Sequence, residues 1–248
     1  TFTTILTRSR SQWFNAVGWG FNHPTQNLYD EYESGDPRRD ASILALSDEQ
    51  ITNPSEDYYL GNRYYCAKRT ILDDTRNYVT LEDSHDSRSP INRIDIRLAD
   101  VYLMYAEACD AIDGPSTSAK CSLTAVDAVN KIRQRAGGAD VAAKFTSDKN
   151  KFMDELRRER AVELSFEGHR FNDLRRWLLL DKAPYNIKTS QEFVRAGKLD
   201  PKNPQKTLVS GWSEKTILTR NFTQKHWWMP LKKKDTSMYP EFFQNPGW

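Results

Sequence analysis

An aromatic, glycine-rich segment near the start of the chain carries the side chains needed to bind a sugar without altering it. Between residues 8 and 22, two tryptophans and two phenylalanines lie among amides, arginines and glycines, with no period that would bury the rings on one side of a helix or strand. Flat aromatic faces stack on the apolar faces of sugar rings, while Asn, Gln and Arg side chains hydrogen-bond to hydroxyl groups. The predicted ligand-binding residues in this segment are Trp13, Phe14, Asn15, Trp19 and Asn22.

A second aromatic cluster is a candidate for another wall of the same site. Residues 58–65 contain four tyrosines, of which Tyr58, Tyr59 and Tyr65 are the candidate ligand contacts. Tyrosines at this spacing also suit an ordinary strand or a long surface loop, so both interpretations stay open. Core packing is the alternative for the first segment, and we favour it for Phe21.

A regular series of glutamates suggests a different chemistry, that of a metal site or a carboxylate catalyst. Four glutamates recur every four residues, so they share one face of a helix that we expect to run through residue 177. Large apolar residues fill most of the remaining angles, so many of these charges must be partly buried and paired. The glutamates are Glu155, Glu159, Glu163 and Glu167, and the arginines placed to pair with them are Arg158, Arg160, Arg170 and Arg175.

The spacing of the only nearby histidine argues against a metal on this helix. Bundles that hold two metal ions use inward-facing glutamates together with a Glu-x-x-His pair at i, i+3. Here Glu167 and His169 are spaced i, i+2, which sends their side chains to different faces. We therefore predict a structural network of ion pairs, without a metal and without a cofactor.

The sequence also lacks the motifs of common enzyme classes. It has neither a glycine-rich phosphate loop nor a Gly-x-Ser-x-Gly elbow, and an abundance of carboxylates is not the geometry of a glycosidase. A net charge of +2 with both signs interspersed gives no electrostatic case for nucleic acid. We therefore predict a binding protein that is not an enzyme and has no nucleic-acid partner.

The elements that must position these residues are mostly helices. An early helix is expected over residues 24–33, and the chain is strongly helical from about residue 94 to 180. Thr124 and Asp127 form a plausible capping box for a helix that ends at Gly137 and Gly138, and this helix and the one before it resemble a tetratricopeptide-type pair. The apolar stripe of the preceding helix, at a 3, 4 spacing, is Leu98, Val101, Tyr102, Tyr105 and Cys109.

These elements divide the chain into three regions of a mainly α protein with little β structure. Residues 1–93 form a loop-rich region that carries the candidate ligand-binding segments, and residues 94–180 form a helical scaffold. Six prolines interrupt residues 181–248, which we expect to be an extended tail. The side chains expected to pack this tail over the helices are Trp212, Trp227, Trp228 and Phe242.

Several strings in the chain resemble, in the expected order, the motifs of the SusD/RagB family of outer-membrane nutrient-binding lipoproteins. The most specific is Glu-Arg-Ala-Val-Glu-Leu-Ser-Phe-Glu-Gly-His-Arg, in which Ala161 stands where the family often has a second arginine. Together the strings span nearly the whole chain. They occupy residues 22–30, 35–38, 97–108, 129–137, 159–170 and 244–248.

The resemblance implies a SusD-like fold and a role in nutrient capture at the cell surface. Family members are about twice this long, so the chain corresponds to a C-terminal portion whose N-terminal half is a further partner. The implied location is the extracellular face of the outer membrane, with a lipid anchor outside these 248 residues. The implied partner is a SusC-like TonB-dependent transporter, and the implied ligand is an oligosaccharide. A peptide ligand, as in RagB-like relatives, and a protein-interaction module without a small ligand remain the alternatives.

Two of the three cysteines are positioned to form a disulfide. Cys109 falls near the end of one expected helix and Cys121 just before the next, so the two thiols could meet across the helix hairpin. The oxidising surface location that the resemblance implies favours a bridge over two free thiols. Cys66 is then left unpaired.

Overall fold

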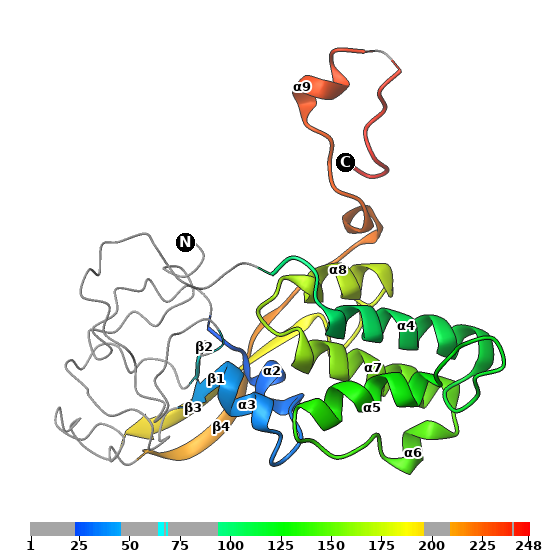
Figure 1. The fold of residues 1–248 in the computed structure, drawn as a ribbon. Coiled ribbons are helices and arrows are strands. Elements are labelled where there is room, and N and C mark those ends of the chain that lie inside the picture. Colours follow the sequence, from blue (N-terminus) through cyan, green and yellow to red (C-terminus); the bar gives the residue numbers. More distant parts are fainter. Residues whose placement is uncertain (1–22, 46–63, 67, 69–93, 196–208, 240) are drawn as a thin grey trace, which may run out of the picture.

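The computed structural model describes residues 23–45, 64–66, 68, 94–195, 209–239 and 241–248 (Figure 1). The N-terminal elements are α2 (Gln26–Asp30), α3 (Pro37–Ser42), β1 (Ile43–Ala45) and β2 (Tyr64–Cys66). The central helices are α4 (Leu98–Asp113), α5 (Ala125–Arg135), α6 (Ala143–Thr146), α7 (Lys149–Glu163) and α8 (His169–Arg176). The C-terminal elements are β3 (Ile187–Arg195), β4 (Val209–Thr219), the 3-10 helix η4 (Gln224–Trp227) and α9 (Lys233–Thr236).

The prediction of a mainly α protein with little β structure is confirmed. Within the described residues the strands make two separate antiparallel pairs, β1 with β2 and β3 with β4. The main core lies between α4, α5 and α7 (Figure 1). Its fully buried side chains include Leu103, Ala106, Val129, Phe152 and Leu156.

The helix pair α4–α5 is built by the local signals that the sequence carries. Thr124 and Asp127 form the expected capping box, in which the Asp127 amide donates to Thr124 Oγ1 at 3.0 Å. Gly137 follows α5 with a φ of +78°, a left-handed conformation that glycine adopts without strain. These signals define both ends of α5.

The buried face of α4 matches the predicted stripe in part: Cys109 is buried in the core and Tyr102 and Tyr105 pack against it, but the prediction is wrong for the two residues at the start of the stripe. Ala99, Leu103 and Ala106 are buried against α5 and α7, whereas Leu98 is 67% exposed and Val101 is 45% exposed. The small side chains at positions 99 and 106 suit the close approach of neighbouring helices, which explains why this face is the one that packs. Leu98 and Val101 are left on the outer face.

The prediction of a single helix through residue 177 is wrong, because this stretch forms two helices, α7 and α8. Helix α7 ends at Glu163, and α8 begins after a turn in which Phe166 has a φ of 62° and Gly168 a φ of 87°. Residues in the left-handed region interrupt a right-handed helix. Glu167 therefore lies in the turn and not on the glutamate face of α7.

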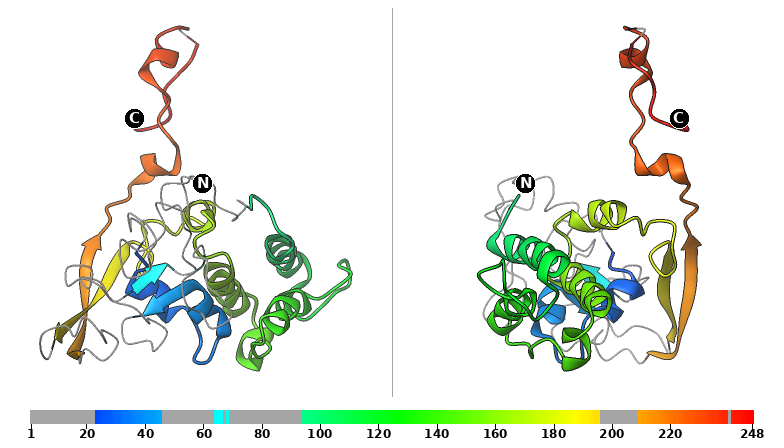
Figure 2. Two further views of the ribbon diagram at one scale, coloured as in Figure 1. Left: turned by 60° about the vertical axis from the view of Figure 1, so that its left-hand side comes forward. Right: turned by 90° about the vertical axis from the view of Figure 1, so that its right-hand side faces the viewer.

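A long hairpin formed by β3 and β4 flanks α2 (Figure 2). Its register runs from Ile187 opposite Thr219 to Arg195 opposite Val209, with two irregularities along β3. The Thr189 amide donates to Asn27 Oδ1 at 2.8 Å, which ties the hairpin to α2. Part of the region predicted as an extended tail is thus a paired ladder.

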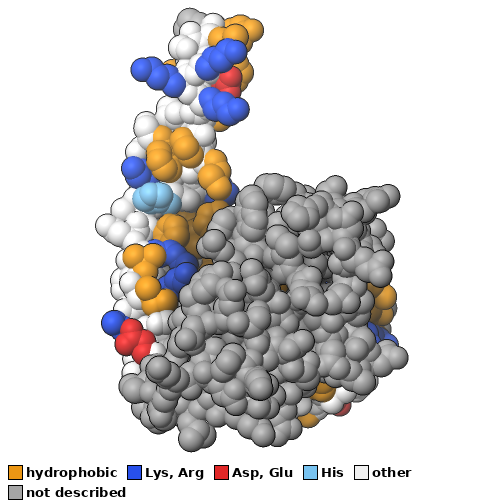
Figure 3. Space-filling model, turned by 90° about the vertical axis from the view of Figure 1, so that its left-hand side faces the viewer, with side chains coloured by type: hydrophobic (Ala, Val, Ile, Leu, Met, Phe, Trp, Pro, Cys, Tyr) orange, Lys and Arg blue, Asp and Glu red, His pale blue; other side chains and the backbone are white. Residues whose placement is uncertain are grey.

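Residues 228–248, called the arm below, project away from the body of the molecule (Figures 2 and 3). Trp227, at the base of the arm, packs near Leu179 and Leu180, and its carbonyl accepts from Arg175 Nε at 2.7 Å. The prediction that the tail packs over the helices therefore agrees with the position of Trp227. It is wrong for Trp228 and Phe242, which are each 55% exposed. The reason is that the arm closes on itself, since Trp248 Nε1 donates to the Trp228 carbonyl at 3.0 Å. The side chain of Trp212 lies outside the described part of the structure.

Candidate functional site

Most of the residues predicted to bind ligand belong to segments that the structure does not describe. Tyr65 lies in β2 opposite Leu44, and only its backbone pairing is described. The other candidates all fall outside the described ranges, so their role stays a prediction. They are Trp13, Phe14, Asn15, Trp19, Asn22, Tyr58 and Tyr59.

Both candidate segments are attached to one small apolar core. The first segment leads directly into α2, and the second connects β1 to β2. Tyr32, Ile43 and Val162 are buried together, with Leu28 packed against them. The Tyr32 hydroxyl donates to the Val162 carbonyl at 3.3 Å, and burial raises the pKa of Tyr32. The C-terminal end of α7 is therefore the common support of both segments.

A buried cluster of charges adjoins this support. We call it the arginine–glutamate cluster. Its members are Glu155, Glu159, Glu163, Glu167, Arg38, Arg97, Arg133, Arg135, Arg158 and Lys68.

Glu163 is held by three arginines from three different parts of the chain. Its carboxylate accepts from Arg38 Nη1 at 3.0 Å, from Arg97 Nη1 at 2.6 Å and from Arg135 Nη2 at 2.6 Å. Burial alone would raise the pKa of Glu163, but the hydrogen bonds from Arg97 and Arg38 outweigh it and hold the pKa below its ordinary value. Glu163 is thus an anion whose charge is already neutralised.

Glu159 is the most deeply buried carboxylate of the cluster. Its side chain is fully inaccessible and accepts from Arg133 Nη1 at 3.1 Å and from Arg38 Nη1. Arg133 also donates to Glu155 at 3.0 Å, and Arg158 donates to Glu155 at 2.9 Å. Each buried carboxylate of the arginine–glutamate cluster therefore meets at least one guanidinium, as burial of a charge requires.

The cluster also joins the two ends of the segment 69–93. Lys68 Nζ donates to Glu167 Oε1 at 2.6 Å and to the Glu163 carbonyl at 2.8 Å. Arg97 Nε donates to Glu167 Oε2 at 2.7 Å, so the residues on both sides of the segment share one carboxylate. Burial lowers the pKa of Lys68, and Glu167 partly opposes that effect. The cluster thus fastens α3, residue 68 and the start of α4 to α7.

The sequence predicted the network but assigned most of its arginines wrongly. Of the four arginines expected to face the glutamates, only Arg158 does so, through Glu155. The others have different partners, because the turn at Gly168 and the folding of distant segments reorient them. Arg160 pairs with Asp100 and Asp173, Arg170 pairs with Glu31, and Arg175 binds the Trp227 carbonyl.

Helical spacing could not have found Arg38, Arg97 and Arg133, because they come from other segments. Their signal in the sequence is that each lies inside one of the family-like strings. Among the described residues, no three His, Cys, Asp or Glu side chains are grouped so that they could hold a metal ion. The carboxylates of the cluster face guanidinium groups, which would repel a divalent cation.

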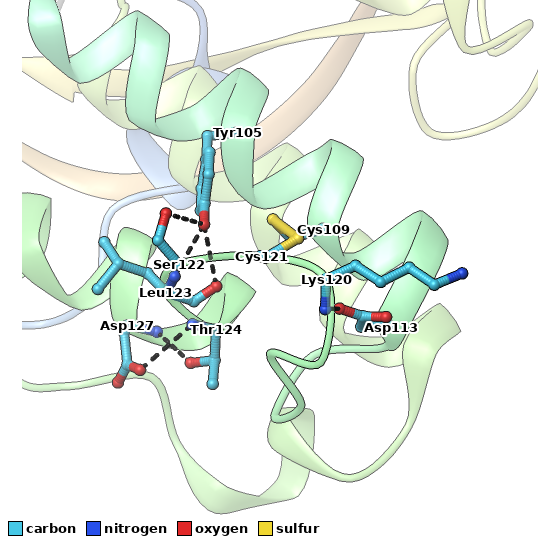
Figure 4. Close-up of a disulfide and its surroundings, with 9 residues drawn as sticks. All are labelled: Tyr105, Cys109, Asp113, Lys120, Cys121, Ser122, Leu123, Thr124 and Asp127. Carbon is cyan, nitrogen blue, oxygen red and sulfur yellow. Dashed lines mark hydrogen bonds between the residues drawn. A yellow bond between two sulfur atoms is a disulfide. The ribbon is translucent and has the colours of Figure 1, made fainter.

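Cys109 and Cys121 form a disulfide across the α4–α5 hairpin (Figure 4). Their Cα atoms are 6.2 Å apart, with a sequence separation of 12. The loop that the bridge closes is further fixed at both ends, since the Lys120 amide donates to Asp113 at 2.7 Å and the Leu123 amide donates to the Tyr105 hydroxyl at 2.8 Å. Cys66 is buried and outside any disulfide.

No described helix combines the length and the apolar character needed to cross a bilayer. The described structure is a helical frame, held by a disulfide and a buried ionic cluster, to which the two aromatic segments are connected. Binding residues are often placed on loops that a rigid scaffold positions.

Comparisons with known proteins agree with this architecture. A SusD-like protein P25 from Formosa agariphila is 32% identical over 169 residues, which is 66% of this chain and 27% of that protein. The structure of a SusD-like protein from Bacteroides fragilis matches with a TM-score of 0.71 and 23% identity, over 99% of this chain and 51% of that chain. Surface glycan-binding protein A from Bacteroides uniformis matches with a TM-score of 0.55 and 20% identity, over 98% of this chain and 46% of that chain.

The chain therefore spans about half the length, or less, of these relatives. The model of the SusD family matches residues 6–248, which is nearly the whole chain. This protein belongs to the SusD family.

Proposed function

We propose that this chain is the C-terminal portion of a cell-surface protein that captures a glycan and passes it, chemically unchanged, to a transporter. The observation that carries the proposal is the match of the SusD family model to residues 6–248. The proposed transporter is a SusC-like TonB-dependent β-barrel. The proposed location is the extracellular face of the outer membrane, with a lipid anchor outside these residues.

A glycan is the proposed ligand for two reasons. One structural relative is a surface glycan-binding protein by its own description. The segments at residues 8–22 and 58–65 combine aromatic rings with amides and arginines, the groups that stack on sugar rings and hydrogen-bond to hydroxyls. Affinity should be modest, because the ligand must later be released.

The disulfide supports the proposed location. Disulfides persist in oxidising surroundings such as cell surfaces and are rare in the reducing cytosol. The bridge between Cys109 and Cys121 therefore fits a protein that faces the exterior.

Binding of the purified protein to an array of soluble glycans and peptides tests the proposal, with Trp13→Ala and Trp19→Ala measured beside the parent. Trp228→Ala is the matched control, since Trp228 is 55% exposed in the arm and outside both candidate segments. We expect a glycan to bind, either candidate substitution to abolish binding without lowering the melting temperature, and the control to bind normally. The glycan should be recovered intact.

Other outcomes would replace the proposal. Binding of peptides alone would favour a peptide-capturing, RagB-like protein. Absence of any ligand would favour a protein-interaction module, and turnover of a glycan by the purified protein would favour an enzyme.

A further inference from the structure

A histidine lies at the point where the arm leaves the body. His226 belongs to η4, and its ring meets two aromatic rings at nearly right angles. The ring centres are 5.9 Å apart for Phe222 and 5.5 Å apart for Trp248, the residue that closes the arm. His226 is therefore in direct contact with both sides of the base of the arm.

A backbone hydrogen bond fixes where the proton of His226 can be. The Thr223 amide donates to His226 Nδ1 at 2.9 Å, as one half of a capping box whose other half joins the His226 amide to the Thr223 side chain. An acceptor nitrogen carries no proton, so the imidazole in this arrangement is neutral. A protonated imidazole has a hydrogen on both nitrogens and offers no acceptor. Protonation would turn the bond into two donors that face each other.

The surroundings of the ring give little compensation for that loss. Thr223 Oγ1 lies 3.1 Å from Nδ1 and could accept its proton, but the Thr223 amide would still point at the same nitrogen. The Trp248 ring would attract an imidazolium, but the Lys225 ammonium already lies 4.5 Å from its centre, and like charges repel.

The other charge next to this part of η4 is also a cation. Arg175 of α8 donates through Nε to the Trp227 carbonyl at 2.7 Å. Within the described residues His226 forms no ion pair with a carboxylate. The neutral imidazole is therefore the form that this site favours.

The same short helix carries the groups that close the arm. Trp248 Nε1 donates to the carbonyls of Lys225 and Trp228, at 2.8 and 3.0 Å, and these two residues flank His226 and Trp227. A 3-10 helix of four residues has few hydrogen bonds of its own, so its capping box is a large part of what fixes it. Loss of the bond to Nδ1 would loosen the turn that presents both carbonyls to Trp248.

We propose that His226 is a pH switch for the arm: its neutral imidazole keeps the base closed, and its protonation opens it. Imidazole is the side chain that ordinarily titrates between about pH 5 and 8. Closure is therefore complete at the upper end of this range and weakens as the pH falls. This property of the chain is separate from glycan capture, and its test measures no ligand.

Trypsin cleavage of the 248-residue protein within Lys232, Lys233 and Lys234 measures the opening, with the cut identified by mass spectrometry. Under native conditions the cleavage rate follows the population of the open form. At each pH the rate is divided by that of a short unstructured peptide with the same lysines, which removes the pH dependence of trypsin itself. From about pH 8 to about pH 5.5 we expect this ratio to rise about three- to fivefold, the effect of losing one ordinary hydrogen bond.

Two substitutions of His226 separate the hydrogen bond from the proton. His226→Gln keeps an acceptor at the position where glutamine completes a capping box, and it cannot be protonated. Its cleavage ratio should stay low at both pH values. His226→Ala has no acceptor and should be cleaved rapidly at both. His169→Gln, in α8, is the control and should respond to pH as the parent does.

Three results would overturn the proposal. A constant ratio in the parent would mean that the arm does not respond to protonation. An equal rise in the parent and in His226→Gln would assign the response to another group. Cleavage of His226→Ala as slow as that of the parent at pH 8 would show that His226 does not hold the base of the arm closed.

Discussion

Glu159 shows what a buried carboxylate requires of its neighbours. Its side chain is fully inaccessible and meets Arg38 and Arg133, whose side chains are 12% and 3% exposed. Glu159→Gln keeps the size of the side chain but removes the one carboxylate that Arg38 and Arg133 share. Each guanidinium keeps other acidic partners, but the most deeply buried counter-charge of the cluster is lost. We expect the free energy of unfolding to fall by roughly 3–5 kcal/mol, measured by denaturant unfolding followed by circular dichroism.

Asp154 on the same helix is the matched control for that substitution. Its side chain is 68% exposed and pairs with Arg157 three residues on. Because water screens exposed pairs, Asp154→Asn should change the stability by less than about 0.5 kcal/mol. Similar effects of the two substitutions would contradict the buried network.

The pH dependence of stability should reveal the cluster as well. Hydrogen bonds and charges from Arg97 and Lys68 overcome the effect of burial and hold the pKa of Glu167 below its ordinary value of 4.5. A lowered carboxyl pKa contributes stability above pH 4.5, and this contribution is lost as the pH falls through the folded-state pKa. The parent should therefore lose more stability than Glu167→Gln when urea unfolding at neutral pH is compared with unfolding at about pH 3.

Asp110 acts in the opposite direction in this experiment. Burial raises its pKa above the ordinary value of 3.8, and one of its carboxylate oxygens has no hydrogen-bond partner. Its protonation stabilises the fold as the pH falls, so the parent curve alone mixes both effects. The difference between the parent and Glu167→Gln isolates Glu167, and identical pH profiles would show that Glu167 contributes no pH-dependent stability.

At the scale of elements, the sequence predicted the helix ends that depend on neighbouring residues alone. Thr124, Asp127 and Gly137 marked both ends of α5, because caps and left-handed glycines act within a few residues. The break between α7 and α8 was missed, since it depends on Phe166 adopting a positive φ, which packing and not helical spacing decides.

The candidate site was predictable only in part. The strings that resemble the family contained Arg38, Arg97 and Arg133, but no spacing rule connects them to glutamates more than 20 residues away in the chain. Pairings of that kind appear only when distant segments fold together. The aromatic residues of the ligand site remain a prediction from their composition, because they lie in segments outside the described ranges.

The α4–α5 hairpin should depend measurably on its disulfide. The bridge closes a short loop, with a separation of 12 residues, and removes entropy from the unfolded chain. For a loop of this size we expect a loss of about 3 kcal/mol when Cys109 and Cys121 are both replaced by Ser, and a fall in Tm of roughly 6–12 °C. Thermal unfolding followed by circular dichroism measures both.

Reduction by dithiothreitol gives the internal control for this prediction. The parent should fall to the Tm of the double-serine protein, and the double-serine protein should not change further. An unchanged Tm after reduction of the parent would show that the hairpin is held by its packing and capping alone.

At the scale of the whole molecule, the arm stands apart from the body (Figures 1 and 3). Hydrogen bonds from Trp248 close its base. The indole of Trp248 donates to the Trp228 carbonyl at 3.0 Å, and the Lys225 ammonium lies 4.5 Å from the centre of its ring. Gln244 exchanges two hydrogen bonds with the backbone of Leu231, at 2.8 and 2.9 Å. Trp248 and Gln244 therefore both hold the two halves of the arm together, and Trp248 does so at the base.

Trp248→Ala should open the arm and leave the body intact. Without the indole, the exposed run Lys232, Lys233 and Lys234 should be cleaved by trypsin several-fold faster, on the order of fivefold, because local opening exposes its backbone. The Tm of the helical body should stay within about 1 °C, since the arm projects away from the helices that form the core. Phe243→Ala is the control, because Phe243 is 82% exposed and its loss should change neither quantity. Equal cleavage rates in the parent and Trp248→Ala, or a matching fall in Tm, would mean that Trp248 does not close the arm as a separate unit.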